Sequence, residues 1–377
     1  MTEATLLQQA VGGDEGAFGK LVEPHRQTLQ AHCYRMLGSA ADAEDAMQET
    51  LLAAWRGMAR FEGRSSLRSW LFTIATNACL KTIERRPKRV LPLDYGPPAD
   101  PHDPIEQQPP EITWIDPYPD EQLGLQDGLA GPEARYERRE SVELAFIAAL
   151  QQLPARQRAV LLLRDVLGFS GQEVADALEA TPTSVYSALQ RAHAAVAERL
   201  PARTQQTTLR SLGDEKLRQI VDRYVEAWES DDVDAIAAML TADATLSMPP
   251  TPSWYRGPDD VKACLRAGPL AGRMGWTLIP VRANGQLSVG SYRVNAATGA
   301  LTPHGVTVLT LDGELIAAIT AFHDAKAPAR FGLRGLSEPA VRRASPGEST
   351  ARGAGRSPEA DDAIRRLADW ARAKLGL

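Results

Sequence analysis

Apolar side chains recur at a helical spacing throughout the first part of the chain. Stripes begin at Phe18, Met47 and Leu67, and in each stripe further apolar residues follow three or four positions apart. A helix with such a stripe buries it against a neighbour, so the pattern predicts a group of packed helices. We place this all-α domain at residues 1–90.

A second group of helices is predicted at residues 136–203. Ser170 to Glu173 has the order of a capping box, and Thr181-Pro182 supplies a cap and a first-turn proline for a longer helix. Two helices joined by so brief a turn form a helix-turn-helix. If the apolar stripe of the longer helix is buried, its polar face and N-terminus present Thr183, Ser184, Ser187, Gln190 and Arg191. A helical hairpin with a polar outer face would fit the same pattern.

The stretch between these groups, residues 91–135, differs in composition. It holds ten Pro, ten acidic residues and a single Arg. Such a sequence has too few apolar side chains to form a core, and proline stiffens an extended chain. We therefore expect an acidic, Pro-rich linker here.

Beyond a polar joint the pattern changes from helical to strand-like. Two helices are predicted at about 212–229 and 232–240, and Asp312-Gly313 is a strong hairpin signal between two later strands. The strand-like runs lie near 275–281, 286–294, 304–311 and 314–323. Helices followed by consecutive antiparallel strands predict an α+β domain, placed at 210–333. The remaining 334–377 is predicted to be a flexible tail that ends in an amphipathic helix opened by Ser357-Pro358.

Overall composition excludes several classes of protein. The chain has 377 residues, 44% apolar residues and a net charge of -6, which is typical of a soluble protein of two or three domains. It contains no apolar run near the ~20 residues of a membrane span and no signal-peptide pattern, so we expect a cytoplasmic protein without a membrane partner. Cys33, Cys79 and Cys264 are too widely spaced for a disulfide framework or a metal pair. We predict buried free thiols and no metal or cofactor.

Local charge contrasts with this acidic total. From Arg56 to Arg89 there are nine basic and two acidic residues. Basic groups interleaved with aromatic residues suit single-stranded DNA, because cations neutralise phosphates while rings or loop pockets receive unstacked bases. Trp70 and Phe72 fit a helical core better than base contact, which favours the loop from Phe61 to Ser66 as the place where a base is held.

Three motifs follow one another along the first 200 residues. They are Asp42-Ala-Glu-Asp-x-x-Gln48-Glu-x-x-Leu52-x-Ala-Trp55, Phe61-x-Gly63-x-Ser65-Ser66-x-x-Trp70-Leu71-Phe72-x-Ile74-Ala75-x-Asn77, and Leu153-Pro154 leading to Ser187-Ala-Leu189-Gln-Arg191-Ala192. In this order they resemble the ECF (extracytoplasmic-function) group of bacterial RNA polymerase sigma factors. The resemblance covers about residues 5 to 200, and the turn of the helix-turn-helix departs from it, with Glu179-Ala180 where the family often has Gly.

The resemblance implies a promoter-specificity subunit, not an enzyme. Residues implied to bind the β′ clamp helices of core RNA polymerase are Asp42, Glu44, Asp45, Gln48, Glu49 and Trp55. Those implied to recognise and open the minus-ten promoter element are Phe61, Gly63, Arg64, Ser65, Ser66, Asn77, Lys81 and Arg85. The second domain would meet the β flap and read the minus-35 element through the five polar residues of its longer helix. The acidic linker would lie in a basic channel that otherwise holds RNA.

Residues 210–333 resemble the SnoaL-like (NTF2-like) fold, a curved sheet that forms a pocket with its helices. Candidate pocket residues for a small-molecule ligand are Trp228, Trp254, Tyr255, Trp276, His304 and His323. The whole chain resembles the branch of ECF factors in which such an extension regulates the sigma factor in cis. Some relatives of the fold are enzymes, and Asp243, His304 or Asp324 could serve as a base, but no spacing singles one out.

A second hypothesis belongs to a different class of protein. A one-component transcription regulator would bind DNA through the helix-turn-helix alone and would use the C-terminal domain as a ligand sensor or degenerate enzyme. A requirement for core polymerase distinguishes the two hypotheses, because only a sigma factor directs that enzyme to a promoter.

Overall fold

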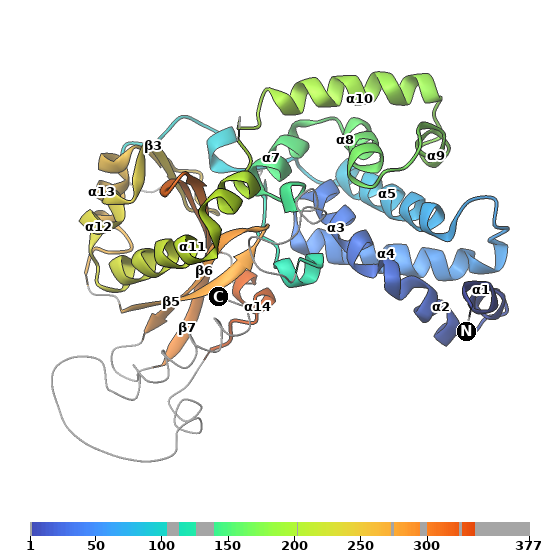
Figure 1. Cartoon of the computed structure of the whole chain (residues 1–377), viewed down its shortest axis with the longest axis horizontal. Coiled ribbons are helices and arrows are strands. Elements are labelled where there is room, and N and C mark those ends of the chain that lie inside the picture. The colour runs from blue at the N-terminus through green and yellow to red at the C-terminus, as the bar shows by residue number, and fades with distance from the viewer. Residues whose placement is uncertain are drawn as a thin grey trace, which may run out of the picture. The chain divides into compact units, whose positions relative to one another are not determined.

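The computed structural model describes residues 2–103, 113–125, 139–201, 203–272, 275–294, 300–323 and 326–335 (Figure 1). The chain divides into two units. Unit 1 comprises Met1–Val90, Glu111–Leu125 and Glu137–Ala202, and unit 2 comprises Leu91–Pro110, Gln126–Tyr136 and Arg203–Leu377. The predicted tail helix lies outside the described residues.

The first helical group of unit 1 contains five α-helices, as the apolar stripes predict. They are α1 (Glu3–Val11), α2 (Glu15–Val22), α3 (Arg26–Leu37), α4 (Ala40–Gly57) and α5 (Leu67–Arg85). Four of them begin after a residue whose side-chain oxygen accepts a backbone N–H of the first turn, namely Thr2, Asp14, Ser39 and Ser66. The core between α3 and α5 includes Leu29, Met36, Leu71 and Phe72.

The second helical group contains the predicted helix-turn-helix. Its helices are α7 (Leu144–Gln152), α8 (Ala155–Leu161), α9 (Gly171–Ala177) and α10 (Pro182–Ala197), with a π-helical turn at Leu162–Val166. The capping box predicted at Ser170 and Glu173 is present, and a second one joins Thr181 to Ser184. The first box begins α9, and the second ends the turn between α9 and α10 by beginning α10.

The turn between α9 and α10 contains a left-handed residue that is not glycine. Glu179 has a φ of 49°, in the left-handed region, and the N–H of Ala180 donates to the Ala175 carbonyl at 2.8 Å. A left-handed conformation places the Cβ of an L-residue close to the following carbonyl oxygen. The chain therefore adopts the turn at an energetic cost that glycine would avoid.

The two helical groups pack against each other within unit 1. Arg35 donates to both the carbonyl and the hydroxyl of Ser141, at 3.0 and 2.7 Å. Arg68 donates to the Leu167 carbonyl at 2.6 Å, and its guanidinium carbon lies 4.3 Å from the centre of the Phe169 ring. Polar and stacking contacts of the buried Arg35 and the half-buried Arg68 thus join segments about a hundred residues apart.

Part of the predicted linker also belongs to the core of unit 1. Strand β2 (Thr113–Trp114) pairs in parallel with β1 (Arg89–Val90), and a short 3-10 helix follows at Asp120–Leu123. The buried apolar residues here are Trp114, Ile115, Tyr118, Leu123 and Leu125. The prediction that this stretch contributes no core is wrong for residues 113–125, because its few apolar side chains are concentrated there.

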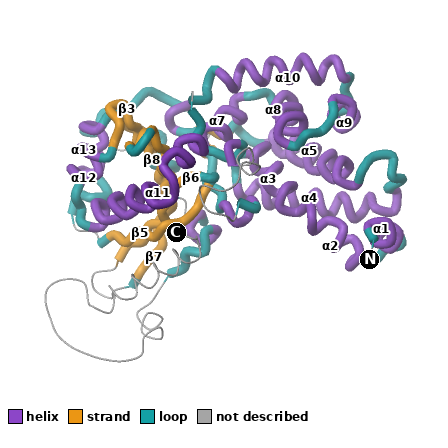
Figure 2. Tube along the Cα trace, viewed as in Figure 1, coloured by secondary structure: helices purple, strands orange, loops and turns teal. Residues whose placement is uncertain are grey.

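Unit 2 is an α+β domain, as predicted (Figure 2). Its sheet has the order β4-β3-β8-β7-β6-β5, and the helix α11 (Gln205–Glu229) packs against strands β5, β6 and β7. The strands are β3 (Leu240–Ser247), β4 (Trp254–Arg256), β5 (Trp276–Ala283), β6 (Gln286–Val294), β7 (Leu301–Asp312) and β8 (Leu315–Phe322). The other helices are α12 (Val233–Ala238), α13 (Pro258–Ala267) and α14 (Ala327–Arg330).

The four predicted strands correspond to β5 to β8, which pair antiparallel in sequence order. The sequence pattern missed β3, β4 and α13, and β3 pairs parallel with β8. Two-residue turns connect β5 to β6 at Asn284-Gly285, where both residues have positive φ, and β7 to β8 at Gly313-Glu314. The hairpin predicted at Asp312-Gly313 is therefore confirmed, with its two turn residues at Gly313-Glu314, one position later than predicted.

The first part of the predicted linker contacts the edge of this sheet. After a 3-10 helix at Pro92–Asp94, the Gly96 carbonyl accepts the indole N–H of Trp254 at 2.8 Å. The N–H of Ala99 donates to the Trp254 carbonyl, also at 2.8 Å. Segment 96–99 is thus bound to the edge strand β4, so it is not a free tether.

The cysteines and the helices are predicted to form neither disulfides nor membrane spans. Cys33, Cys79 and Cys264 are free and buried, as predicted. Of the helices in the described ranges, none is both long enough and apolar enough to cross a membrane.

Replacing Glu179 by Gly should stabilise the helix-turn-helix. Relief of the left-handed strain, roughly 1–2 kcal/mol, exceeds the added chain entropy of the unfolded state, roughly 0.5–1 kcal/mol. Amide hydrogen exchange in α9 and α10 should slow about two- to fivefold. The matched control is Ala180→Gly, which relieves no positive φ and should speed exchange. Equal behaviour of the two variants would contradict this explanation of the turn.

Candidate polymerase and nucleic-acid interface

Helix α4 carries the six residues implied to bind polymerase, and these residues differ in their exposure to solvent. Asp45, Gln48 and Glu49 are exposed, and their spacing places them on one side of the helix. Leu52 continues this side and is 55% exposed, an unusual position for a large apolar residue. Leu52 belongs to the sequence motif but is not among the residues implied to bind polymerase; its position three and four residues after Glu49 and Gln48 is the sequence signal that places it on this side. The exposed side is therefore acidic with an apolar end.

The other three implied polymerase contacts are less accessible. Asp42 is only 3% exposed and forms ion pairs with Arg86 and with Arg89, whose Nη2 lies 2.8 Å from its Oδ2. Glu44 is half-buried, and Trp55 is half-buried against the Phe18 ring. In this conformation Asp42 joins α4 to the end of α5.

The loop between α4 and α5 forms a hollow of about 310 Å³. Its lining residues are Arg60, Phe61, Glu62, Gly63, Arg64, Ser65 and Trp70. The rings of Phe61 and Trp70 lie 5.0 Å apart, and Gly63 has a φ of 69° that bends the loop. An open hollow with two aromatic rings and flanking cations has the chemistry needed to hold an unstacked base.

Helix α5 extends a polar surface away from this loop. Asn77, Lys81 and Arg85 are exposed and four residues apart, so they share one side of the helix. Ser66 is exposed as well, but its hydroxyl oxygen caps α5 by accepting the N–H of Ser69 at 3.0 Å.

The nine cations counted in the sequence do not all belong to this surface. Arg68 is bound to the second helical group, and Arg89 donates to the Trp114 carbonyl as well as to Asp42. Arg64 donates to Glu62 at 2.7 Å on the loop surface. The positive surface is thus smaller than the sequence count suggests.

Helix α10 presents most of the implied minus-35 residues. Thr183, Ser184, Gln190 and Arg191 are exposed, whereas Ser187 is half-buried. The structure adds Tyr186, which is 52% exposed and lies beside Arg164, 5.9 Å from its guanidinium carbon to the ring centre. Sequence reasoning missed Tyr186; its position next to Ser187 on the same helix was the only signal available.

In unit 2 the structure brings four of the six candidate pocket residues together. Ring centres are 6.3 Å apart for Trp228 and Trp276, 4.9 Å for Trp276 and His304, and 4.7 Å for His304 and His323. The buried indole N–H of Trp228 has no hydrogen-bond partner among the described residues, whereas that of Trp276 donates to the Pro269 carbonyl at 2.8 Å. We call these four residues the ring cluster.

The remaining candidates lie elsewhere in unit 2. Trp254 binds segment 96–99 through its indole, as described above, and Tyr255 belongs to the hydrophobic core. Asp243, considered as a base, is exposed and accepts a hydrogen bond from Thr241, and Asp324 lies outside the described residues.

Burial keeps both histidines of the ring cluster neutral. Desolvation is the main cause that lowers the pKa of His323 to about 4, and the neighbouring His304 adds to the effect. The pKa of His304 is lowered by burial and then by the charge of Arg293. Neutral imidazole rings can accept or donate one hydrogen bond each and carry no charge at pH 7.

Comparison with known proteins agrees with this geometry. Residues 21–89 match Sigma-70 region 2, residues 143–196 match Sigma-70 region 4, and residues 221–319 match the SnoaL-like domain. The chain is 40% identical to the ECF RNA polymerase sigma factor SigG of Mycobacterium tuberculosis (strain H37Rv) over 84% of each chain. It is 31% identical to SigM of the same strain over 53% of this chain and 85% of SigM.

A solved structure shows the same fold. The crystal structure of the Mycobacterium tuberculosis extracytoplasmic function sigma factor SigJ aligns with a TM-score of 0.51 and 22% identity over 82% of this chain and 97% of SigJ. Helical regions with a helix-turn-helix, followed by an NTF2-like domain, define a sigma factor with a fused SnoaL-like domain. The chain belongs to the ECF RNA polymerase sigma factors, which act in transcription initiation.

Replacing His323 by Gln should reduce the loss of stability in acid. The folded pKa of about 4 lies below the unfolded value near 6.5, so the stabilisation is present above pH 6.5 and is lost as the pH falls toward 4. Between pH 7 and pH 5 the native protein should lose about 2 kcal/mol more than the variant, as measured by urea unfolding of unit 2. His102→Gln, on an exposed residue, is the control and should leave the pH dependence unchanged.

Proposed function

We propose that unit 1 opens the minus-ten promoter element with the hollow of the Arg60–Ser65 loop and the exposed side of α5. The observation that supports this best is the hollow itself, about 310 Å³ and flanked by Phe61 and Trp70. A base flipped from the duplex could stack there while Lys81 and Arg85 neutralise phosphates of the same strand. Contacts with phosphates would position the protein on the DNA, and contacts with bases would determine which sequence is recognised.

The minus-35 element would be read by α10. Thr183 and Ser184 lie in its first turn, where a recognition helix approaches base edges, and Gln190 and Arg191 lie further along the exposed side. Tyr186 adds an exposed ring between them. The half-buried Ser187 contributes less surface than its position in the motif implies.

Core polymerase would be bound through α4, and region 4 would meet the β flap. The supporting surface is the exposed side formed by Asp45, Gln48, Glu49 and Leu52. An apolar residue beside carboxylates suits a partner helix with complementary charge. Asp42 would reach the partner only after its ion pairs with Arg86 and Arg89 separate. Because polymerase works on the chromosome, we place the protein in the cytoplasm.

Regulation in cis would pass from unit 2 through the linker. Segment 96–99 follows region 2 directly in the chain and is bound to Trp254 of strand β4 by two hydrogen bonds. A change in the SnoaL-like domain that moves β4 therefore moves the linker. The ring cluster would take a small ligand with a hydrogen-bond acceptor for the Trp228 indole. We assign this domain regulation, not catalysis.

Lys81→Ala and Arg85→Ala should each weaken promoter opening. Each variant loses about one phosphate contact, so the slope of log affinity against log salt should fall by about one. Holoenzyme binding to a promoter with a melted minus-ten region, titrated with salt, measures this slope. Lys20→Ala, which removes an exposed cation from α2, should keep the native slope. The assignment of α5 is excluded if all three variants behave alike.

Trp254→Phe should change sigma activity without unfolding unit 2. The substitution removes the indole N–H that binds Gly96 while it keeps an apolar ring at β4. In run-off transcription with core polymerase, the amount of transcript made with the variant should differ at least twofold from that made with the native protein. The change should be toward the amount made with a chain that ends at residue 204. Tyr255→Phe, which removes a hydroxyl from the same strand at a core residue of unit 2, is the matched control and should keep native activity. Native activity in both Trp254→Phe and the truncated chain would refute coupling through the linker.

A further inference from the structure

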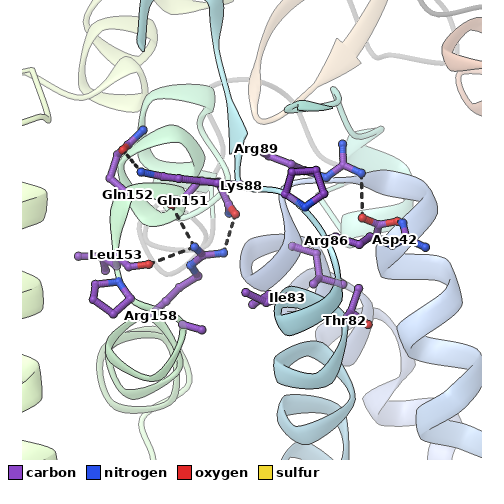
Figure 3. A pocket seen from close by; sticks show the side chains of 14 residues that line it. Asp42, Thr82, Ile83, Arg86, Lys88, Arg89, Gln151, Gln152, Leu153 and Arg158 are labelled. Atoms are coloured by element: carbon purple, nitrogen blue, oxygen red, sulfur yellow. Dashed lines mark hydrogen bonds and ion pairs between the residues drawn. The ribbon is translucent and has the colours of Figure 1, made fainter. Parts of the chain in front are cut away.

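A pocket of about 380 Å³ lies between the two helical groups of unit 1 (Figure 3). The first group contributes the end of α5 and the residues after it, and the second contributes the end of α7 and the start of α8. Figure 3 shows Arg86, Arg89 and Asp42 on one side and Arg158 with Gln151 on the other. Lys88 reaches across to the side-chain oxygen of Gln152.

The charge of this pocket is strongly positive. Of the described residues that line it, four are cationic and one, Asp42, is a carboxylate. Asp42 is already paired with both Arg86 and Arg89. Among the described lining residues the cations therefore outnumber the carboxylates by three, although Asp45, outside the pocket, lies 3.9 Å from Arg86 and offsets part of this charge. In a partly enclosed space electrostatic attraction is stronger than in bulk water.

Arg158 is the residue that points to an anion. Its side chain is buried at 4% exposure, yet all its acceptors are neutral oxygens, those of Met36, Gln151 and Leu153. No carboxylate of the described residues pairs with it, and its Nε has no hydrogen-bond partner among them. Buried charges in proteins are normally paired with an opposite charge. This arginine therefore lines the pocket without a counter-ion from the part of the chain that the structure describes.

We propose that this pocket binds a small molecule that carries phosphate groups. Phosphate oxygens accept charge-assisted hydrogen bonds from cationic side chains, and three arginines and one lysine surround the space. The volume of about 380 Å³ is that of a small-molecule site. Bound phosphate would supply the counter-ion that Arg158 lacks.

The bound molecule would also hold the two helical groups together. Arg86 and Lys88 belong to the first group, and Arg158 belongs to the second, so one anion contacts both. Asp42 would then remain in its ion pairs and away from the polymerase. This consequence rests on the proposed function of α4, whereas the binding of phosphate does not.

Isothermal titration of the full-length protein with inorganic pyrophosphate, in magnesium-free buffer at constant ionic strength, tests the site. We expect one pyrophosphate per chain and a Kd at least tenfold weaker for Lys88→Ala and for Arg86→Gln, since each loses a charge-assisted contact. Both residues lie on the exposed rim, so these variants avoid removing the buried Arg158. Arg85→Ala, on the same helix but outside the pocket, should bind like the native chain.

Three results would overturn the proposal: no binding to the native chain, equal weakening by Arg85→Ala, or native affinity in both pocket variants. Tight binding of a single-stranded oligonucleotide that needs Lys88 and Arg86, with no binding of pyrophosphate, would assign the cations to nucleic acid instead. Native binding of core polymerase without pyrophosphate, measured in parallel, keeps failure of this site distinct from failure of the sigma assignment.

Discussion

Buried guanidinium groups hold unit 1 together. Arg158 donates to the Met36 carbonyl at the end of α3 and to carbonyls at the end of α7, and Arg35 donates to Ser141. Helix C-termini leave carbonyls without partners and carry partial negative charge, so a cation placed there offsets part of its desolvation cost. Burial lowers the pKa of Arg158 to about 10, which still leaves it charged at pH 7. Removing one of these arginines would leave several buried carbonyls unsatisfied at once.

The same packing decides which functional residues are available. Asp42 and Arg68 belong to functional motifs or to the basic stretch, yet both are engaged inside unit 1. The loop at Phe61 and the exposed sides of α4 and α5 stay accessible. If α4 binds polymerase as proposed, Asp42 becomes available only when its ion pairs with Arg86 and Arg89 separate. A closed form and a polymerase-bound form would then compete for the same carboxylate.

The linker is divided between the two units. Residues 113–125 bury aromatic side chains in unit 1, where the Tyr34 hydroxyl donates to the Asp116 carbonyl at 2.8 Å, and segment 96–99 binds the edge strand of unit 2. Segment 96–99 also covers an edge strand that would otherwise expose unpaired backbone groups.

The periodicity of apolar residues and the chemistry of caps and turns determined most of the secondary-structure elements of this protein. Apolar stripes, capping boxes and turn residues predicted the two helical groups, the helix-turn-helix and the strands β5 to β8, because these signals act over a few neighbouring residues. Motif order determined the family. Only tertiary structure decided that β3 pairs parallel with β8, that Asp42 is buried and that no carboxylate among the described residues pairs with Arg158. Those features depend on contacts between residues far apart in the chain, which no local pattern records.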